Sequence, residues 1–185
     1  LPSITNVGTL NVTAKAENKN YKDVTVDYTL KVTRKAVTVT ADNKSKVFGE
    51  KDPELTATVT GTIGKDTVEY TLSRKAGEDV GTYTITPSGK AEQTNYKVTY
   101  ATGTLTITKA ETMTLTPELT GKDAEKEYDS KPLSGGATAS VTKGTKITYS
   151  TDGGKTWSET LPSITNVGTL NVTAKAENKN YKDVT

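Results

Sequence analysis

The residues best placed for chemistry lie in one short segment that reads Ser-Thr-Asp-Gly-Gly-Lys-Thr-Trp and begins at residue 150. A carboxylate such as Asp152 can accept hydrogen bonds from the backbone N–H groups of a tight turn, and the two glycines beside it permit positive φ angles. The indole of Trp157 is then expected to pack under the turn. The segment predicts a hairpin turn with a structural role, formed by Ser150, Asp152, Gly154, Thr156 and Trp157.

This turn segment fits the pattern Ser-x-Asp-x-Gly-x-Thr-Trp and resembles the Asp-box of sialidases and other β-propellers. In those families the box is structural. The enzymes among them also carry several boxes, a set of arginines that bind the substrate carboxylate, and a Tyr nucleophile with a Glu partner. This chain has one box, and its only arginines are Arg34 and Arg74. We therefore expect no catalytic residue, and a glycan-active enzyme is the weaker alternative.

The other acidic residues do not form a pattern typical of catalysis or metal binding. Glu50 and Asp52, and likewise Glu78 and Asp79, lie in turn-like contexts. A glycosidase needs two carboxyl groups that face each other across a cleft, and a calcium loop needs several acids in one short loop. The chain also contains no His and no Cys, which removes the commonest general base, the commonest zinc ligands and any disulfide. We expect no metal and no cofactor.

A covalent crosslink between side chains is one alternative that the sequence leaves open. Such a link needs Lys with Asn, or Thr with Gln, together with a nearby acid. Lys and Asn are plentiful in this chain, but no arrangement of them stands out. A crosslink would supply the robustness that small extracellular domains often obtain from disulfides.

The composition excludes several classes of partner. The chain has 185 residues, of which 32% are hydrophobic, and its 24 Lys and Arg nearly balance its 22 Asp and Glu. No run of like charge is long enough to suggest a nucleic-acid-binding tail. No apolar stretch is long enough to span a membrane. We expect neither a nucleic-acid partner nor a membrane span.

Short strands are the elements that must position these residues. From Val24 to Thr33, apolar residues alternate with polar ones, which is the period of a strand with one buried face. Clusters of Gly, Pro, Asn and Asp interrupt such runs about every 8–12 residues, as in β-sandwiches. The sequence predicts an all-β fold built from immunoglobulin-like β-sandwich modules.

The chain repeats itself on two scales. Residues 1–25 and 161–185 are identical, 160 positions apart. A weaker repeat places Val-Gly-Thr at residues 7, 80 and 167, and Asn-Tyr at residues 20, 95 and 180. We interpret Val-Gly-Thr as a junction of loop and strand, and Asn-Tyr as a turn residue followed by a core aromatic. The segments that join the modules, 33–36 and 108–111, contain no Gly or Pro, so we expect the modules to form an elongated, semi-rigid rod.

These repeats predict three segments. Residues 1–34 are the C-terminal part of a module of the same type as 110–185. Residues 35–109 are a complete short module of 75 residues. Residues 110–185 are a longer module that lacks its last strand. With its last strand the long module would have 85 residues, and the two lengths together give the 160-residue period.

The short module resembles the MBG-type repeats of bacterial surface adhesins. The resemblance rests on Val-Phe-Gly-Glu-Lys-Asp-Pro at residue 47, on Asp-Val-Gly-Thr-Tyr at 79, on Asn-Tyr at 95 and on the ending Thr-Leu-Thr-Ile-Thr-Lys at 104. Phe48 stands where Tyr is usual. The long module, with Tyr-Asp-Ser-Lys-Pro-Leu at residue 128, resembles the related YDG-type and bacterial Ig-like repeats, with Ser130 in place of the usual Gly.

The resemblance implies an extracellular protein at the bacterial cell surface, attached to the cell wall or secreted, in which many modules form a stalk. It offers no catalytic residues. We expect a non-enzymatic spacer whose main partners are the neighbouring repeats of the same chain. Two alternatives stay open: an adhesive repeat with many weak sites for host or cell-surface glycans or proteins, and a filament subunit that donates a strand head to tail to the next copy.

Overall fold

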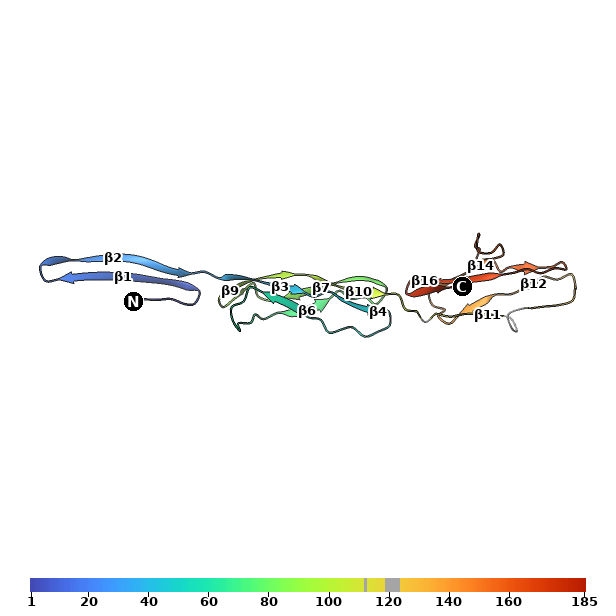
Figure 1. Cartoon of the computed structure of the whole chain (residues 1–185), viewed down its shortest axis with the longest axis horizontal. Coiled ribbons are helices and arrows are strands. Elements are labelled where there is room, and N and C mark those ends of the chain that lie inside the picture. Colours follow the sequence, from blue (N-terminus) through green and yellow to red (C-terminus); the bar gives the residue numbers. More distant parts are fainter. Residues whose placement is uncertain (112, 119–123) are drawn as a thin grey trace. The chain divides into compact units, whose positions relative to one another are not determined.

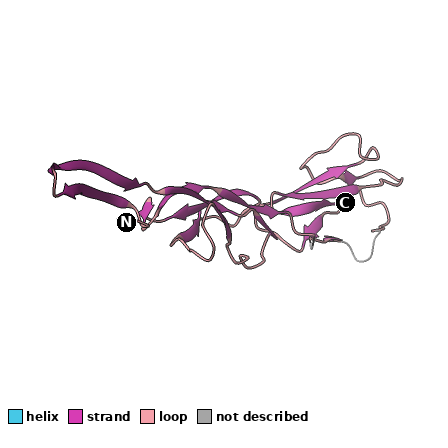
Figure 2. Cartoon of the chain, turned by 60° about the vertical axis from the view of Figure 1, so that its left-hand side comes forward, coloured by secondary structure: helices cyan, strands magenta, loops and turns pink. Residues whose placement is uncertain are grey.

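The described part of the chain contains only strands, turns and loops (Figure 2). The structure is a computed structural model that describes residues 1–111, 113–118 and 124–185. No helix occurs in these residues, which confirms the all-β class. They form two compact units: unit 1 comprises residues 1–44, 53–76 and 83–105, and unit 2 comprises residues 45–52, 77–82 and 106–185.

Unit 1 begins with a long hairpin, drawn in blue in Figure 1. Strand β1 (Gly8–Asn18) pairs antiparallel with β2 (Tyr21–Val32), in the register that places Gly8 opposite Val32. The carboxamide of Asn18 closes the turn by accepting the N–H of Asn20 at 2.9 Å. Much of the apolar face predicted for β2 is exposed to solvent, with 78% of Tyr21 and 65% of Val24 accessible.

A four-stranded sheet follows in unit 1, in the order β5-β3-β9-β8. Its two central strands, β3 and β9, run parallel, and the edge strands pair antiparallel to them. The strands are β3 (Lys35–Ala41), β5 (Ala57–Thr60), β8 (Glu92–Gln93) and β9 (Tyr96–Ala101).

The core of unit 1 follows from the period of two in these strands. In β3, Val37 and Val39 are buried and the threonines between and after them are not. They pack with Val68, Tyr96 and Val98 in one cluster of buried residues. β-branched residues suit such positions because they fill a pleated surface with few rotamers to lose.

A second four-stranded sheet has the order β4-β10-β7-β6. Its strands are β4 (Lys44–Val47), β6 (Thr71–Arg74), β7 (Gly81–Ser88) and β10 (Gly103–Thr108). Ile85 and Leu105 in this sheet are fully buried. At the start of β10 a Cβ atom on Gly103 would lie 2.4 Å from the carbonyl oxygen of Ala41. Glycine is required there because the two backbones approach too closely for any side chain.

Unit 2 contains shorter pairs of strands and one three-stranded sheet, in the order β14-β16-β17. In the described residues after 110, its strand pairings are antiparallel. Besides that sheet, β11 pairs with β13 and β12 pairs with β15. The strands are β11 (Leu115–Pro117), β12 (Leu133–Ser134), β13 (Ala137–Ala139), β14 (Thr145–Ser150), β15 (Ser163–Ile164), β16 (Thr173–Asn178) and β17 (Tyr181–Val184).

The identical segments 1–25 and 161–185 have different environments in the two units. In unit 2, Ala176 is fully buried and packs with Met113 and Ala139, while Tyr181 and Val184 are half-buried against the same cluster. In unit 1 the equivalents of the last two, Tyr21 and Val24, are exposed. Strand β1 starts at Gly8, because Gly8–Val12 pairs with Tyr28–Val32. In the second copy the equivalent of Gly8 is Gly168, but β16 starts only at Thr173. Packing partners, and not the local sequence, therefore decide the extent of these strands.

The finer architecture stays a prediction. The boundaries 1–34, 35–109 and 110–185 come from repeats in the sequence, whereas the compact units divide the chain within the short module. The arrangement of the modules as immunoglobulin-like sandwiches in a rod is likewise a prediction from the sequence. In the residues that the structure describes, no helix has the length and apolar character needed to cross a membrane.

Candidate functional site

The first site is a junction inside unit 1 where the hairpin meets the short module. The carboxamide of Asn95 accepts the backbone N–H of Val7 at 2.9 Å, and its NH₂ group donates to the side-chain oxygen of Asn6 at 3.0 Å. The main-chain carbonyl of Asn95 accepts the N–H of Lys35 at 2.9 Å. One residue therefore binds the first strand of its own repeat and the Val-Gly-Thr segment of the repeat before it.

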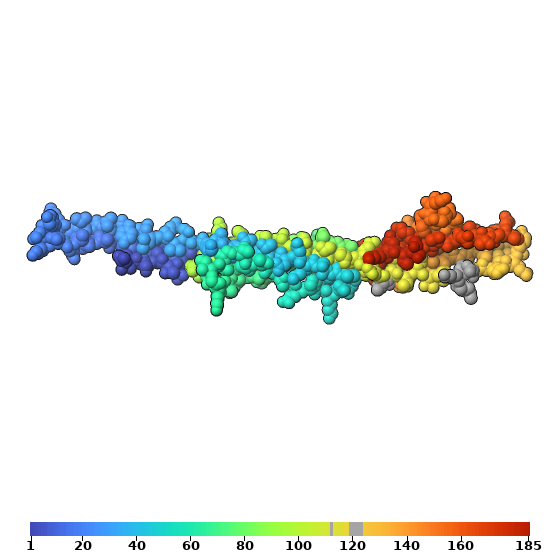
Figure 3. Space-filling model, viewed as in Figure 1, coloured from blue at the N-terminus to red at the C-terminus, as the bar shows by residue number. Residues whose placement is uncertain are grey.

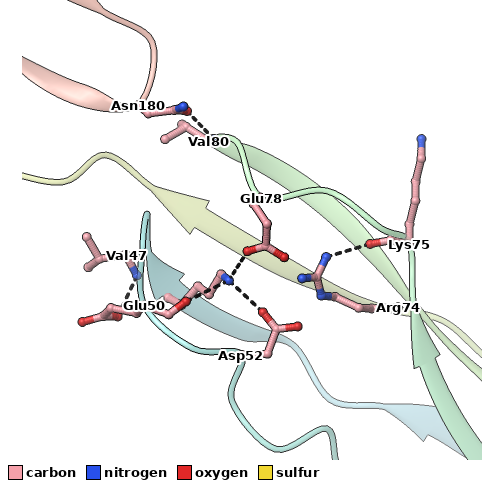
Figure 4. A network of polar contacts seen from close by, with 9 residues as sticks. Val47, Glu50, Asp52, Arg74, Lys75, Glu78, Val80 and Asn180 are labelled. Carbon is pink, nitrogen blue, oxygen red and sulfur yellow. Dashed lines mark hydrogen bonds and ion pairs between the residues drawn. The ribbon is translucent and has the colours of Figure 1, made fainter. Parts of the chain in front are cut away.

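The second site is a junction inside unit 2 and has the same geometry. The carboxamide of Asn180 accepts the N–H of Val80 at 2.9 Å, as Figure 4 shows, and its NH₂ group donates to Asp79 at 2.8 Å. Its main-chain carbonyl accepts the N–H of Ala110 at 3.0 Å. We call this set of three hydrogen bonds the asparagine contact.

Both asparagine contacts rest on the same backbone scaffold. Lys35 pairs in parallel with Tyr96 in the first junction, and Ala110 pairs in parallel with Tyr181 in the second. This pairing fixes the asparagine that precedes each tyrosine. Because a half-buried N–H without a partner is costly, the carboxamide contributes by satisfying the valine N–H. From sequence alone, Asn-Tyr is interpreted as a turn residue followed by a core aromatic, an interpretation that does not include this role.

The two junctions differ in charge. Asn6 precedes valine in the first junction, whereas Asp79 does so in the second and pairs with Lys179 at 2.6 Å. The ammonium of Lys179 and the carboxamide of Asn180 together hold the pKa of Asp79 below its usual range. A carboxylate that accepts two such bonds is stabilised in its charged form. The second junction therefore contains a titratable group where the first has a neutral amide.

Further contacts at the junctions are peripheral. Arg34 pairs with Glu92 at 3.2 Å in the first junction, and Lys182 pairs with Glu111 in the second. All four side chains are exposed by at least a third, and ion pairs of this kind contribute little to stability. In unit 2 the rings of Phe48 and Tyr181 meet edge to face, with their centroids 5.4 Å apart. Such a pair adds apolar contact to the asparagine contact.

The structure brings the predicted turn residues together between β14 and the segment that follows. The carboxylate of Asp152 accepts the N–H groups of Lys155 and Thr156 at 3.0 and 2.9 Å, and the hydroxyl of Thr156 at 2.6 Å. The hydroxyl of Ser150 donates to Asp152 at 2.7 Å and accepts the N–H of Gly154 at 2.8 Å. These bonds hold the pKa of Asp152 far below its usual range, with the Thr156 hydroxyl as the largest cause.

The chemistry of this turn favours a structural role. Every bond named above fixes Asp152 as a charged acceptor, and a carboxylate with so low a pKa is a weak general base at neutral pH. Trp157 donates its indole N–H to the carbonyl of Gly154 at 3.1 Å, and the residue as a whole is 38% exposed. The residues near 155, orange in Figure 3, stand out from the strands of the same unit.

A buried lysine forms a separate cluster in unit 2, shown in Figure 4. The side chain of Lys46 is only 3% exposed, and its ammonium lies 2.8 Å from Asp52, 2.5 Å from Glu78 and 3.0 Å from the carbonyl of Glu50. The two carboxylates, Asp52 first, raise the pKa of Lys46. A protonated amine is not a nucleophile, so this geometry favours an ion-pair cluster over the crosslink chemistry that the sequence leaves open. In the described residues, no three acidic side chains converge closely enough to hold a metal ion.

A comparison with known protein families matches part of the chain. Residues 37–106 match the family described as MBG domain (YGX type), which confirms the resemblance predicted for the short module. No curated protein matches the chain, and no solved structure does. The matched residues include Val80 and Asn95, one participant from each junction.

Proposed function

Because residues 37–106 form an MBG domain of the YGX type, we propose that the chain is a non-enzymatic spacer segment of a bacterial surface protein. An MBG domain suggests a repeat of a surface protein. The spacer proposal adds that the modules are immunoglobulin-like sandwiches in an elongated stalk outside the cell, attached to the wall or secreted. Among the described residues, the asparagine contact occurs twice, and each time its carboxamide joins a repeat to the repeat before it.

The observation that carries this proposal is the recurrence of the asparagine contact. Asn95 and Asn180 lie in repeats of different type, yet each uses its carboxamide to bind the valine N–H and the residue before it in the preceding repeat, and its main-chain carbonyl to bind the first strand of its own repeat. A chain selected to hold its repeats in a defined relation needs such a contact. Independent binding modules on flexible linkers do not need it.

The reach of such a spacer follows from strand length. Strand β2 has 12 residues, which corresponds to about 40 Å at about 3.3 Å per residue. A 160-residue period of two modules would then add roughly 60–80 Å. Small-angle scattering of arrays with one, two and three periods tests this. We expect the maximum dimension to grow in proportion to the number of periods, and growth with its square root would contradict a stalk.

An adhesive repeat is the second candidate, and the exposure of Trp157 favours it. A tryptophan residue that is 38% exposed on a protruding turn is available to stack on a sugar or an apolar partner. Titration of the chain with cell-wall and host glycans, followed by Trp157 fluorescence, tests the idea. A saturable change that Trp157→Ala abolishes would support adhesion. Loss of any hydrolytic activity in Asp152→Ala would instead favour the enzyme alternative.

A strand-donating filament is the third candidate, favoured by the apolar face of the hairpin. Tyr21, Val24 and Val26 are 78%, 65% and 59% exposed, whereas the first two have half-buried counterparts in unit 2. The cluster around Met113 and Ala139 of another copy would cover this face as it covers Tyr181 and Val184. Scattering at several concentrations decides: growth of the particle with concentration supports strand exchange, and concentration-independent monomers exclude it.

A further inference from the structure

The segment Asn166–Thr169 is an exposed copy of a segment that binds a neighbour elsewhere in the chain. It has the same sequence as Asn6–Thr9, whose Val7 N–H is bound by Asn95. Val7 is half-buried, whereas Val167 is 91% exposed.

The glycine of this exposed copy already has the φ angle of the glycines in the bound copies. The φ angle of the glycine after valine is 159° at Gly8 and 155° at Gly81, both in junctions, and 155° at Gly168. The segment is therefore preorganised at this glycine, and docking would not require a change of its φ angle.

We propose that Asn166–Thr169 is a docking surface for the Thr94-Asn95-Tyr96 corner of a further short repeat with the sequence of residues 35–109. The inference rests on the proposed spacer function and names the partner of one repeat end. The asparagine of the incoming repeat accepts the N–H of Val167, and its NH₂ group donates to Asn166, as Asn95 does with Val7 and Asn6.

Charge selects the short repeat over the long one. The corner of the long repeat carries Lys179 beside Asn180, and the ammonium pairs with Asp79 at the end of the short repeat. Asn166 offers no carboxylate to such a lysine. The corner of the short repeat carries the neutral Thr94 beside Asn95 and already binds the sequence Asn-Val-Gly-Thr. The contacts at each junction thus favour a short repeat after a long one and a long repeat after a short one, in agreement with their order in the chain.

The test extends the full chain after Thr185 by a copy of its own residues 26–109, so that residue 185 continues as residue 25 does. Hydrogen exchange of the Val7 and Val167 amides is measured by NMR. The two valines have identical neighbours in sequence, so their intrinsic exchange rates are equal and Val7 is an internal standard. We expect the extension to slow exchange at Val167 by at least about tenfold, toward the rate of Val7, because a bound N–H needs local opening to exchange.

Two variants of the appended copy show that the asparagine is responsible. Asn95→Ala in the appended copy should restore fast exchange at Val167 and leave Val7 unchanged. Thr40→Ala in the appended copy, at an exposed strand position, should leave both amides protected. Unprotected Val167 in the extended chain overturns the proposal. Slow exchange at Val167 in the unextended chain that depends on concentration would assign the surface to a second copy and also overturn it.

A second extension tests the choice of repeat. Here residues 26–34 followed by 110–185 are appended, so that a long repeat meets Val167. We expect less than a tenfold slowing, and protection equal to that from the short repeat would overturn the pairing preference. The spacer function is judged separately by the growth of the maximum dimension with the number of periods in small-angle scattering. If that growth is linear but Val167 is unprotected, only the docking proposal is wrong. If the growth follows the square root but Val167 is protected, only the spacer function is wrong.

Discussion

Replacement of Asn180 by alanine tests the asparagine contact most simply. The substitution removes the acceptor of the Val80 N–H and the donor to Asp79. Asn180 is only 9% exposed and Val80 is half-buried, so water does not fully replace the lost acceptor. An unsatisfied buried N–H costs about 1–3 kcal/mol. Asp79 adds little, because its side chain is 55% exposed and can be hydrated. We expect Asn180→Ala to lower the free energy of unfolding of unit 2 by about 1–3 kcal/mol.

The chain provides a matched control at Asn20. Residues 17–25 repeat residues 177–185, but Asn20 lies in the exposed turn of the hairpin. The bond that closes this turn uses the backbone N–H of Asn20 and survives truncation of the side chain. We expect Asn20→Ala to change stability by less than about 0.5 kcal/mol, as is usual for exposed sites.

Urea unfolding and amide exchange measure both variants. Faster exchange at Val80, with an unchanged rate at Val7, should accompany the loss of stability in Asn180→Ala. Equal stability of the two variants, or an unchanged exchange rate at Val80, would refute the reasoning, because the same nine-residue segment would then behave alike with and without a neighbour.

Three further predictions concern the junctions and the short module. Asn95→Ala should speed exchange at the Val7 amide and lower stability by about 0.5–1.5 kcal/mol, less than at Asn180 because the site is more exposed; an unchanged Val7 rate would contradict this. The pKa of Asp79 is lower in the folded chain than in the unfolded chain, where it is about 4. The charged carboxylate therefore stabilises the fold fully above about pH 4, and this stabilisation is lost as the pH falls through the lower folded pKa. The side-chain amide signals of Asn180 should therefore shift below about pH 4 while those of Asn95 do not, and parallel shifts would argue against the charge difference. Gly103→Ala should cost about 1–3 kcal/mol in chemical unfolding, because its Cβ meets the Ala41 carbonyl; a neutral effect would mean that the backbones separate easily.

The strands and the turn at Asp152 could be predicted from the sequence because their signals are local. Period-two alternation in segments such as 37–41 follows directly from the burial of one face of a strand. The residues of the turn at Asp152 are close in sequence, and so are their hydrogen bonds. The MBG resemblance likewise rests on the order of short motifs, and the family match to residues 37–106 confirms it.

The asparagine contact was not accessible in the same way, because its partners lie 88 and 100 residues apart in the chain. An Asn-Tyr pair is explained locally as a turn and a core aromatic, so the local interpretation left nothing unexplained. A signal was nevertheless present. Asn-Tyr follows each Val-Gly-Thr at a similar distance in all three copies, and a turn alone does not require asparagine each time.

The identical segments mark a second limit of prediction from sequence. Residues 8–12 form a strand and residues 168–172 do not, although the letters are the same. The difference comes from the pairing of Tyr28–Val32 with the first copy. A tertiary partner can override any local propensity, which is why strand limits were the least predictable feature.

The central claim is that asparagine contacts hold successive repeats in a fixed relation. The most direct test compares two three-period arrays by small-angle scattering, one unaltered and one with Asn95→Ala and Asn180→Ala in every copy. We expect the unaltered array to have the maximum dimension of three periods joined in line. The variant array should retain folded modules by circular dichroism but have a smaller maximum dimension. Equal dimensions of the two arrays would contradict the claim.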